Sequence, residues 1–191
     1  MAGASILCSI VLFSCSGNTS TDTATDTTAN DPKKVADEVN EKKLDSTDLK
    51  EDAEFAVKIA DAGMLEVQLG KLALTNASSP KVKEFAKMMI DDHTKAGNEL
   101  KEAASKKNIM LPVAMSDKCQ KKYDELAEKK GKDFDKDYIS AMVDGHEDVL
   151  KEMKDESEKG KDGDLRLWAS GKVAVVSHHL EVAKSTKETL K

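Results

Sequence analysis

Four side chains of this 191-residue chain have residue types and positions that could bind a metal ion. They are three histidines and one carboxylate, each on a different amphipathic segment: Glu66, His93, His146 and His179. Imidazole nitrogens with a carboxylate oxygen suit zinc, iron, copper or nickel, whereas calcium prefers sites made of oxygen ligands alone. The set therefore predicts one transition metal ion, with zinc, iron and copper as candidates, and no organic cofactor.

Each of the four residues lies on the apolar stripe of its segment. His93, for example, has apolar neighbours at helical spacing on both sides: Ala86, Met89, Ala96 and Leu100. A titratable side chain in that position is costly unless a partner compensates it. Each of the four also lies near the midpoint of its segment, so that packed helices would bring them to one level. We therefore expect the four to converge in the core.

Two interpretations of this cluster are open. A metal ion could bind all four side chains, and a closed tetrahedral zinc site of this kind is structural or serves storage. Alternatively, Glu66 could accept hydrogen bonds from the histidines in a polar network that fixes the register of the helices. A di-iron carboxylate site is excluded, because it needs Glu-x-x-His on two helices. Three residues before His93 and His146, the chain has Ile90 and Val143 instead.

Side chains beside the histidines could support the site. Three acidic residues could orient the imidazole rings through hydrogen bonds, or could simply be charged residues on a helix surface: Asp92, Asp144 and Glu181. Met89 and Met142 each precede a histidine by four residues, and a thioether beside an imidazole suits Cu(I), although methionine is also common in cores. His178 lies about 100° around the helix from His179, so we expect it at the rim.

The elements that would position these residues are helices. Charged residues make up 35% of the chain and aromatic residues 4%, a composition that favours an all-α domain. Apolar spacing and capping residues predict four long helices, at 53–77, 80–107, 134–158 and 164–190, and an extra short helix at 117–130 before the third of them. With these connections we expect an antiparallel four-helix bundle over residues 52–191.

The first 51 residues are predicted to be an export signal and a tether. An apolar run at 6–13 precedes Ser14-Cys15, so residues 1–15 resemble a signal peptide that ends in a bacterial lipobox with Cys15 as the lipidated residue. A plain signal peptide with an incidental cysteine is the alternative. Residues 16–51 are predicted to be a flexible tether, rich in Thr and Asp, with a marginal helix at 32–44. We therefore expect an exported protein of the periplasm or outer membrane, anchored to the membrane through this lipid.

Composition and motifs exclude several functions. The formal net charge is -6 and Lys and Glu are interspersed, so a basic footprint for nucleic acid is absent. The predicted bundle has one cysteine, Cys119, which permits neither an internal disulfide nor a CxxC zinc motif. No nucleophile–base pair, phosphate-binding loop or cofactor fingerprint appears, and an open three-histidine metal centre is the only feature that could support catalysis.

Several short motifs together resemble a known family. They are spread over residues 52–191: Phe55-Ala56, Leu69-Gly70-Lys71-Leu72-Ala73, Asp91-Asp92-His93, Phe134-Asp135-x-x-Tyr138, His146 and His179-Leu180-Glu181. This pattern resembles the domain-of-unknown-function family number 4142, whose members are exported, ferritin-like four-helix proteins often labelled as outer-membrane proteins. The resemblance implies a ferritin-like bundle and an envelope location, but no established activity. The family's motif residues in this chain include the whole cluster and add Tyr138 to its surroundings.

We therefore expect an envelope-anchored four-helix bundle that binds a transition metal for storage, sensing or stress protection and does not catalyse a reaction. The alternative is a structural or interaction domain of a lipoprotein, whose His/Glu cluster is only a hydrogen-bonded core network. This alternative predicts that no metal binds and that mutation of the cluster costs stability alone. The sequence identifies no protein partner.

Overall fold

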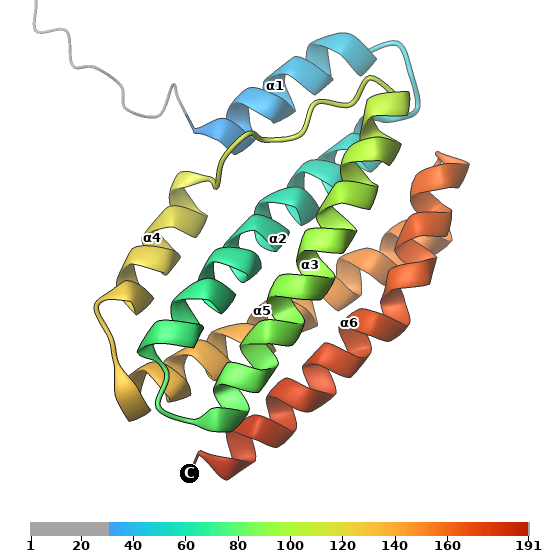
Figure 1. The fold of residues 1–191 in the computed structure, drawn as a ribbon. Coiled ribbons are helices and arrows are strands. Elements are labelled where there is room, and N and C mark those ends of the chain that lie inside the picture. Colours follow the sequence, from blue (N-terminus) through green and yellow to red (C-terminus); the bar gives the residue numbers. More distant parts are fainter. Residues whose placement is uncertain (1–30, 191) are drawn as a thin grey trace, which may run out of the picture.

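The computed structural model describes residues 31–190 of the chain. This part is built from six helices (Figure 1): α1 (Pro32–Leu44), α2 (Lys50–Asn76), α3 (Pro80–Lys106), α4 (Asp117–Ala127), α5 (Gly131–Lys159) and α6 (Gly163–Thr189). The predicted all-α architecture is confirmed. The expected signal peptide, Cys15 and the first part of the tether lie outside the described residues. None of the helices within residues 31–190 combines the length and apolarity needed to cross a membrane.

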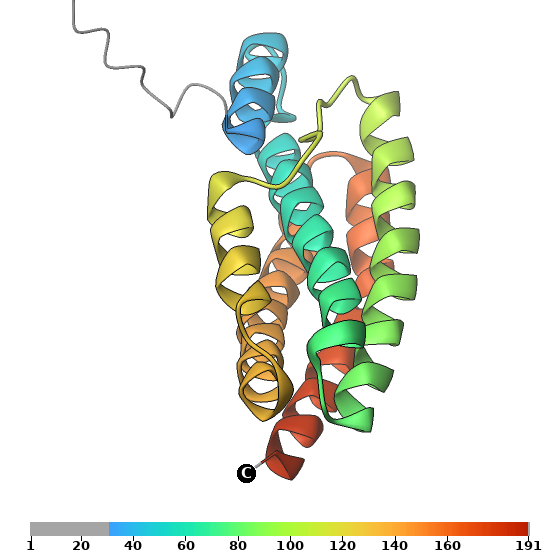
Figure 2. The same ribbon diagram turned by 60° about the vertical axis from the view of Figure 1, so that its left-hand side comes forward.

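Helices α2, α3, α5 and α6 form a four-helix bundle (Figures 1 and 2). Each of them packs against two others: α2 against α3 and α5, and α6 against α3 and α5. In Figure 1, α2 and α6 run downward while α3 and α5 run upward, so that every contacting pair is antiparallel. The predicted bundle with an extra short helix is therefore present. That the bundle resembles ferritin in particular stays a prediction.

The connection between α3 and α5 is long, because both helices run in the same direction. Residues 107–116 cross one end of the bundle beside α1, and α4 then returns along α2 and α5 (Figure 1). Asn108 starts this crossing with a φ of 58°, a left-handed conformation that asparagine tolerates better than most residues. The backbone N–H of Ile109 donates to the carbonyl of Ala104 at 3.0 Å, which closes the end of α3.

Helix α1, expected only as a marginal helix in the tether, is packed onto the bundle. Asn40 is buried and exchanges two hydrogen bonds with the backbone of Met110: its amide nitrogen donates to the carbonyl at 2.8 Å, and its oxygen accepts from the N–H at 2.7 Å. The carboxylate of Asp31 caps the first turn of α1 and also accepts from the N–H of Asp117. The helix is thus tied at two points to the connection that leads into α4.

Buried carboxylates fix the other connections. Asp135 accepts from the N–H and hydroxyl of Ser78 and thereby holds the turn between α2 and α3. Asp61 accepts from the N–H and hydroxyl of Ser116 at 2.7 Å each, where α4 begins. Asp52 accepts from backbone N–H groups before α6. Charged acceptors make strong hydrogen bonds to backbone donors, so each carboxylate stabilises one loop at a defined place on the bundle.

The core consists of two apolar clusters separated along the bundle axis. One contains Leu69, Met89, Val143 and Leu180 among its members, and the other contains Ile59, Leu100, Val149 and Val176. On each of the four helices, the candidate site residue lies in sequence between a member of one cluster and a member of the other. The predicted polar residues therefore occupy a single layer between two apolar regions.

The approach of α2 to α3 depends on Gly70, which is buried in the helix interface. A Cβ atom built on this residue would lie 2.9 Å from Cγ1 of Ile90 and 3.1 Å from the carbonyl oxygen of Ala86. Both distances are shorter than ordinary van der Waals contact, and the second involves rigid backbone. The two helices can be this close only because residue 70 has no side chain.

We predict that Gly70→Ala destabilises the protein by about 1–2 kcal/mol, because the overpacking outweighs the better helix propensity of alanine. The control is Gly171→Ala on α6, where a built Cβ meets nothing within 4 Å. This variant should be neutral or more stable by up to about 1 kcal/mol. Urea unfolding followed by circular dichroism measures both, and equal effects of the two substitutions would contradict the packing argument.

Candidate metal centre

Each long helix contributes one residue to the polar layer. Glu66 comes from α2, His93 from α3, His146 from α5 and His179 from α6. The side chains of His146 and His179 are 0% and 1% exposed, and those of Glu66 and His93 are 6% and 10% exposed. The structure thus brings together all four residues that the sequence placed on the apolar stripes.

Hydrogen bonds orient each imidazole ring through one of its two nitrogens. His93 Nδ1 lies 2.9 Å from Glu66 Oε2, and His179 Nε2 lies 2.9 Å from Asp92 Oδ2. His146 Nδ1 lies 2.8 Å from the carbonyl oxygen of Met142 and 3.5 Å from Glu66 Oε1. Because all these partners are acceptors, the nitrogen facing each of them carries the hydrogen, and this fixes the tautomer of each neutral ring.

The other nitrogen of each ring is then a lone-pair acceptor. These atoms are His93 Nε2, His146 Nε2 and His179 Nδ1, and all three are buried without a hydrogen-bond partner among the described residues. The ring centroids are 5.3 to 5.5 Å apart. One ring nitrogen of each histidine lies within 4.8 Å of one from each of the other two. Three buried lone pairs without a donor form a nitrogen ligand set for a metal ion.

The spacing of the three nitrogens can be compared with that of zinc ligands. Zinc–nitrogen distances of about 2.0–2.1 Å place the ligands of a tetrahedral ion about 3.4 Å apart. The present nitrogens lie within 4.8 Å of one another, which leaves room for an ion between them. The hydrogen bonds that the rings donate to Glu66, Asp92 and the Met142 carbonyl would hold the ring orientations around an ion.

Glu66 has a different position from the one predicted for a fourth ligand. Its two carboxylate oxygens face Nδ1 of His93 and Nδ1 of His146, the nitrogens on which those neutral rings carry their hydrogens. Within residues 31–190, the group close enough to hold an ion consists of the three histidines without Glu66. Glu66 is therefore placed to orient two rings, and a metal bound by the histidines would keep a coordination position that the protein does not fill.

The charge states of His146 and His179 agree with metal binding. Burial acts to raise the pKa of Glu66, but the neighbouring histidines outweigh it and lower that pKa to about 2. Burial lowers the pKa of His146, and it lowers that of His179 to about 4. Burial also acts to lower the pKa of His93, yet the carboxylates of Glu66 and Asp92 raise it. At neutral pH, His146 and His179 are therefore in the uncharged form that a metal requires.

Of the four residues expected to surround the histidines, two are close to the cluster. Asp92 bonds to His179 on α6 and so links two helices, rather than orienting His93 beside it in the sequence. Tyr138 is fully buried and stacks on Phe134 with 5.5 Å between ring centroids. Burial and the charge of Glu66 raise the pKa of Tyr138, so its hydroxyl is neutral.

The other two expected neighbours do not meet the cluster. The structure places Asp144 and Glu181 on the exposed surface, with no hydrogen bond to a ring among the described residues. His178 is also exposed, as expected for a residue at the rim. Met142 takes part through its backbone carbonyl, a contribution that side-chain patterns do not indicate.

A cavity of about 860 Å³ opens beside the cluster. Part of its wall consists of Glu66, Asp92, His93 and His179, and much of the rest is apolar. The polar layer is thus accessible from the side of this cavity. The sequence does not predict this cavity, because the cavity depends on the gaps left between packed helices.

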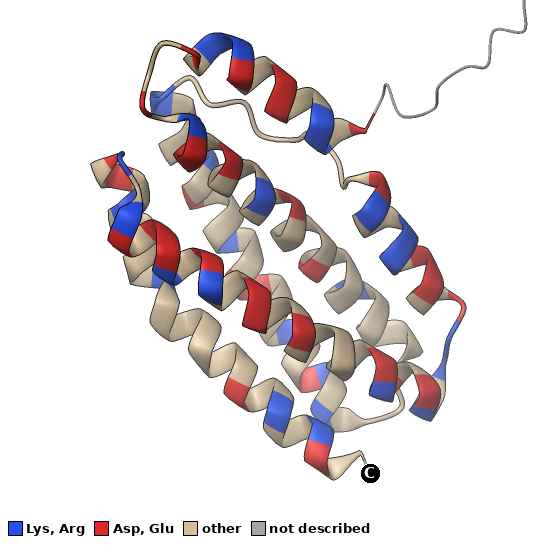
Figure 3. Ribbon diagram, turned by 180° about the vertical axis from the view of Figure 1, so that it is seen from behind, with Lys and Arg blue, Asp and Glu red and all other residues tan. Residues whose placement is uncertain are grey.

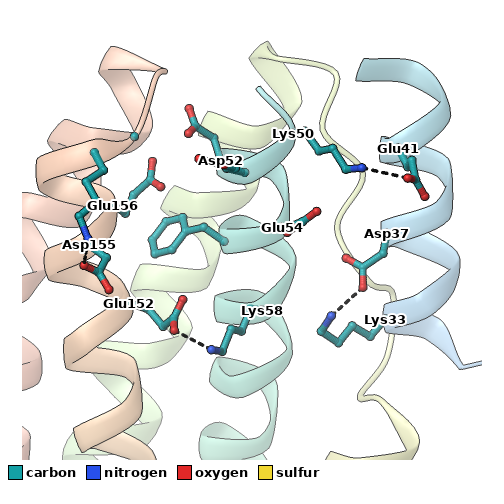
Figure 4. Close-up of a pocket in the computed structure, with 14 residues that line it drawn as sticks. Lys33, Asp37, Glu41, Lys50, Asp52, Glu54, Lys58, Glu152, Asp155 and Glu156 are labelled. Atoms are coloured by element: carbon teal, nitrogen blue, oxygen red, sulfur yellow. Dashed lines mark hydrogen bonds and ion pairs between the residues drawn. The ribbon is translucent and has the colours of Figure 1, made fainter. Parts of the chain in front are cut away.

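A second cavity, of about 540 Å³, lies among α1, α2 and α5 and is mostly charged (Figure 4). Ion pairs cross or line it, among them Lys58–Glu152 at 2.7 Å and Lys50–Glu41 at 2.9 Å. Glu156 is buried at its edge. Within residues 31–190, the three-histidine cluster is the group of side chains that meets the geometric requirement for a metal, so the acids of this cavity do not form a second one.

Comparison with known proteins connects this site to a family. Residues 36–186 match the family described as "Domain of unknown function (DUF4142)". The matched region begins inside α1 and ends inside α6, so it contains the bundle and every residue of the cluster. No curated protein and no solved structure matched the chain.

Glu156 provides a test of the electrostatics at the charged cavity. Burial and the charges of Asp52 and Asp162 raise the pKa of Glu156 from 4.5 to about 7, against the effect of Arg166. Its protonated form is therefore favoured in the folded state. The stability that this proton contributes is fully present below the unfolded pKa near 4.5 and is lost as the pH rises toward 7.

We predict that Glu156→Gln stabilises the protein at pH 8 by about 1–3 kcal/mol and has little effect at pH 4.5. Thermal unfolding at several pH values measures the difference. Glu158→Gln, the same substitution at an exposed position two residues away, is the control and should show no such dependence. A pH-independent effect of Glu156→Gln would contradict the assigned ionisation.

Proposed function

The chain belongs to the DUF4142 family of domains of unknown function, and on that premise we propose that it binds one transition metal ion through His93, His146 and His179. The observation that carries the proposal is the set of three buried ring nitrogens without hydrogen-bond partners. An unsatisfied buried polar group costs about 1–3 kcal/mol. A metal ion would satisfy all three nitrogens at once, whereas hydrogen bonds already occupy the other side of each ring.

The surroundings favour a role in holding the metal, in storage, sensing or stress protection, over catalysis. Both oxygens of Glu66 face imidazole nitrogens, so it is poorly placed to act as a general base. The Tyr138 hydroxyl is neutral. Burial raises the pKa of the Cys119 thiol to about 11, which keeps it protonated and unreactive. Three nitrogen ligands are compatible with zinc, iron or copper.

A structural network is the second candidate, and a specific observation favours it. The bonds from His93 to Glu66 and from His179 to Asp92 join three of the four bundle helices without any metal. Such a network would fix helix register. This network gives a hydrogen-bond partner to one nitrogen of each ring. It gives none to the other nitrogen of each ring, although that nitrogen is also buried.

We predict that protein stripped of metal with a chelator takes up about one Zn²⁺ or Co²⁺ per chain. His146→Ala should weaken this binding by at least about 100-fold, because it removes a ligand, and Glu66→Gln by about 10–100-fold, because it loosens two rings. Calorimetric titration and elemental analysis measure affinity and stoichiometry. His178→Ala is the matched control and should change the affinity by less than about twofold, since the side chain is exposed.

Melting temperatures separate the two candidates. Metal binding raises the stability of the folded state by about 2.7 kcal/mol when the free ion exceeds its Kd 100-fold, so the wild-type protein should melt at a higher temperature with zinc than with chelator. The His146→Ala variant should lose this difference. A wild-type protein that binds no metal and melts at one temperature in both conditions would support the structural network instead.

We also infer that the domain is exported and anchored to the bacterial envelope, in the periplasm or at the outer membrane, through a lipid on Cys15. Support comes from the sequence Leu12-Phe13-Ser14-Cys15 after a short apolar run, and from the polar segment that follows. This segment would tether the bundle to the membrane. Lys and Arg residues are interspersed with Asp and Glu residues along the helices (Figure 3), and such a bundle would face water.

We predict that the full chain, expressed in a bacterial host, partitions into the detergent phase and that Cys15→Ala moves it to the aqueous phase. The reason is the loss of the acyl chains, each contributing about 0.8 kcal/mol per buried methylene. Cys8→Ala, which changes a cysteine inside the apolar run, is the control and should partition like the wild type. Equal partitioning of all three proteins would disprove lipidation at Cys15.

A further inference from the structure

The cavity beside the histidine cluster has the size of a small-molecule site. Its volume of about 860 Å³ lies within the range of about 300–1,000 Å³ that is common for ligand pockets. It reaches from the polar layer toward the connection after α3, where Met110 and Leu111 line it. The cavity therefore joins the candidate metal to the outside of the bundle.

The walls of this cavity divide into a polar end and an apolar body. Glu66, Asp92, His93 and His179 line the polar end. Buried side chains of the apolar cluster above the polar layer line the body: Ile59, Leu100, Val149, Met153 and Val176. Such walls suit a molecule with one polar head and an apolar chain.

Charge decides the sign of the polar head. Four lysines line the cavity, Lys43, Lys95, Lys101 and Lys172, and Lys172 is paired with Glu99 at 2.5 Å. Glu66 and Asp92, the acidic residues of its wall, lie at the polar end and accept hydrogen bonds from imidazoles. A bound divalent metal and the three other lysines together outweigh these two acidic residues, which favours an anion.

We propose that this cavity binds a medium-chain monocarboxylate, whose carboxylate takes the open coordination position of the metal and whose alkyl chain lies along the apolar wall. The inference rests on the proposed metal site. The three histidines leave this position free because Glu66 orients two of the rings and is outside the ligand group. A carboxylate oxygen is a suitable fourth ligand for an ion held by three imidazoles.

Trp168 makes the binding directly measurable. It is the single tryptophan of the chain and lines the cavity. Its fluorescence can therefore be followed while octanoate is added to zinc-loaded protein. Three further probes separate the contributions: acetate has the head alone, octanol has the chain without charge, and octylammonium has the opposite charge. We expect octanoate to bind at least about tenfold more tightly than each of them, and at least about tenfold more tightly with zinc than without it.

A cavity-filling variant tests the location. Gly63 lines the cavity, and a Cβ built there meets nothing within 4 Å, so Gly63→Phe starts a bulky side chain at the cavity wall without a clash at Cβ. It should weaken octanoate binding at least about tenfold and leave zinc uptake unchanged. Gly171→Phe is the matched control, since residue 171 is also helical and open but does not line the cavity, and it should bind octanoate like the wild type.

The possible failures are distinguishable because zinc content is measured on the same samples. Zinc-loaded protein that does not respond to octanoate would overturn this inference alone. Octanol or octylammonium binding as tightly as octanoate would overturn the anionic head, and equal affinity with and without zinc would overturn the contact with the metal. Protein that takes up no zinc would overturn the proposed function, and this inference with it.

Discussion

The pairing of buried imidazoles with oxygen acceptors is the constraint on which the rest of the structure depends. Polar rings between two apolar clusters are tolerated only if their N–H groups find partners. Glu66 on α2 faces His93 on α3 and His146 on α5, while Asp92 on α3 holds His179 on α6. These contacts cross three of the four helix interfaces, so a shift of any long helix along its axis would break at least one of them.

The same pairing defines the chemistry of the site. Because each neutral ring donates from one nitrogen, its lone pair must lie on the other, and those three lone pairs have no donor among the described residues. Glu66 contributes more by orienting two rings than it would as a ligand. Its place outside the ligand group leaves a coordination position free, and the adjacent cavity gives that position an entrance.

Acidic side chains elsewhere in the bundle follow a related rule. Asp52, Asp61 and Asp135 are buried, and each accepts hydrogen bonds from the backbone of a connection. Several N–H or O–H donors face these carboxylates, so their buried oxygens are satisfied. Glu156 is the contrasting case, since one of its oxygens is buried without a partner and the charges nearby are mainly negative. The charged form of that group is accordingly the one that the fold disfavours.

Local physics let the sequence determine the helices and the choice of cluster residues. Periodicity and caps are properties of neighbouring residues, so the six ranges lie within about three residues of those observed, and Glu66 and the three histidines face inward as predicted. Tertiary structure alone decided that Asp92 binds His179 rather than His93, that Glu66 lies behind the rings, that Asp144 and Glu181 face water, and that a cavity opens beside them. Those outcomes depend on how each helix is rotated and packed against the others, because ångström-scale distances between side chains on different helices are not encoded in the spacing along any one of them.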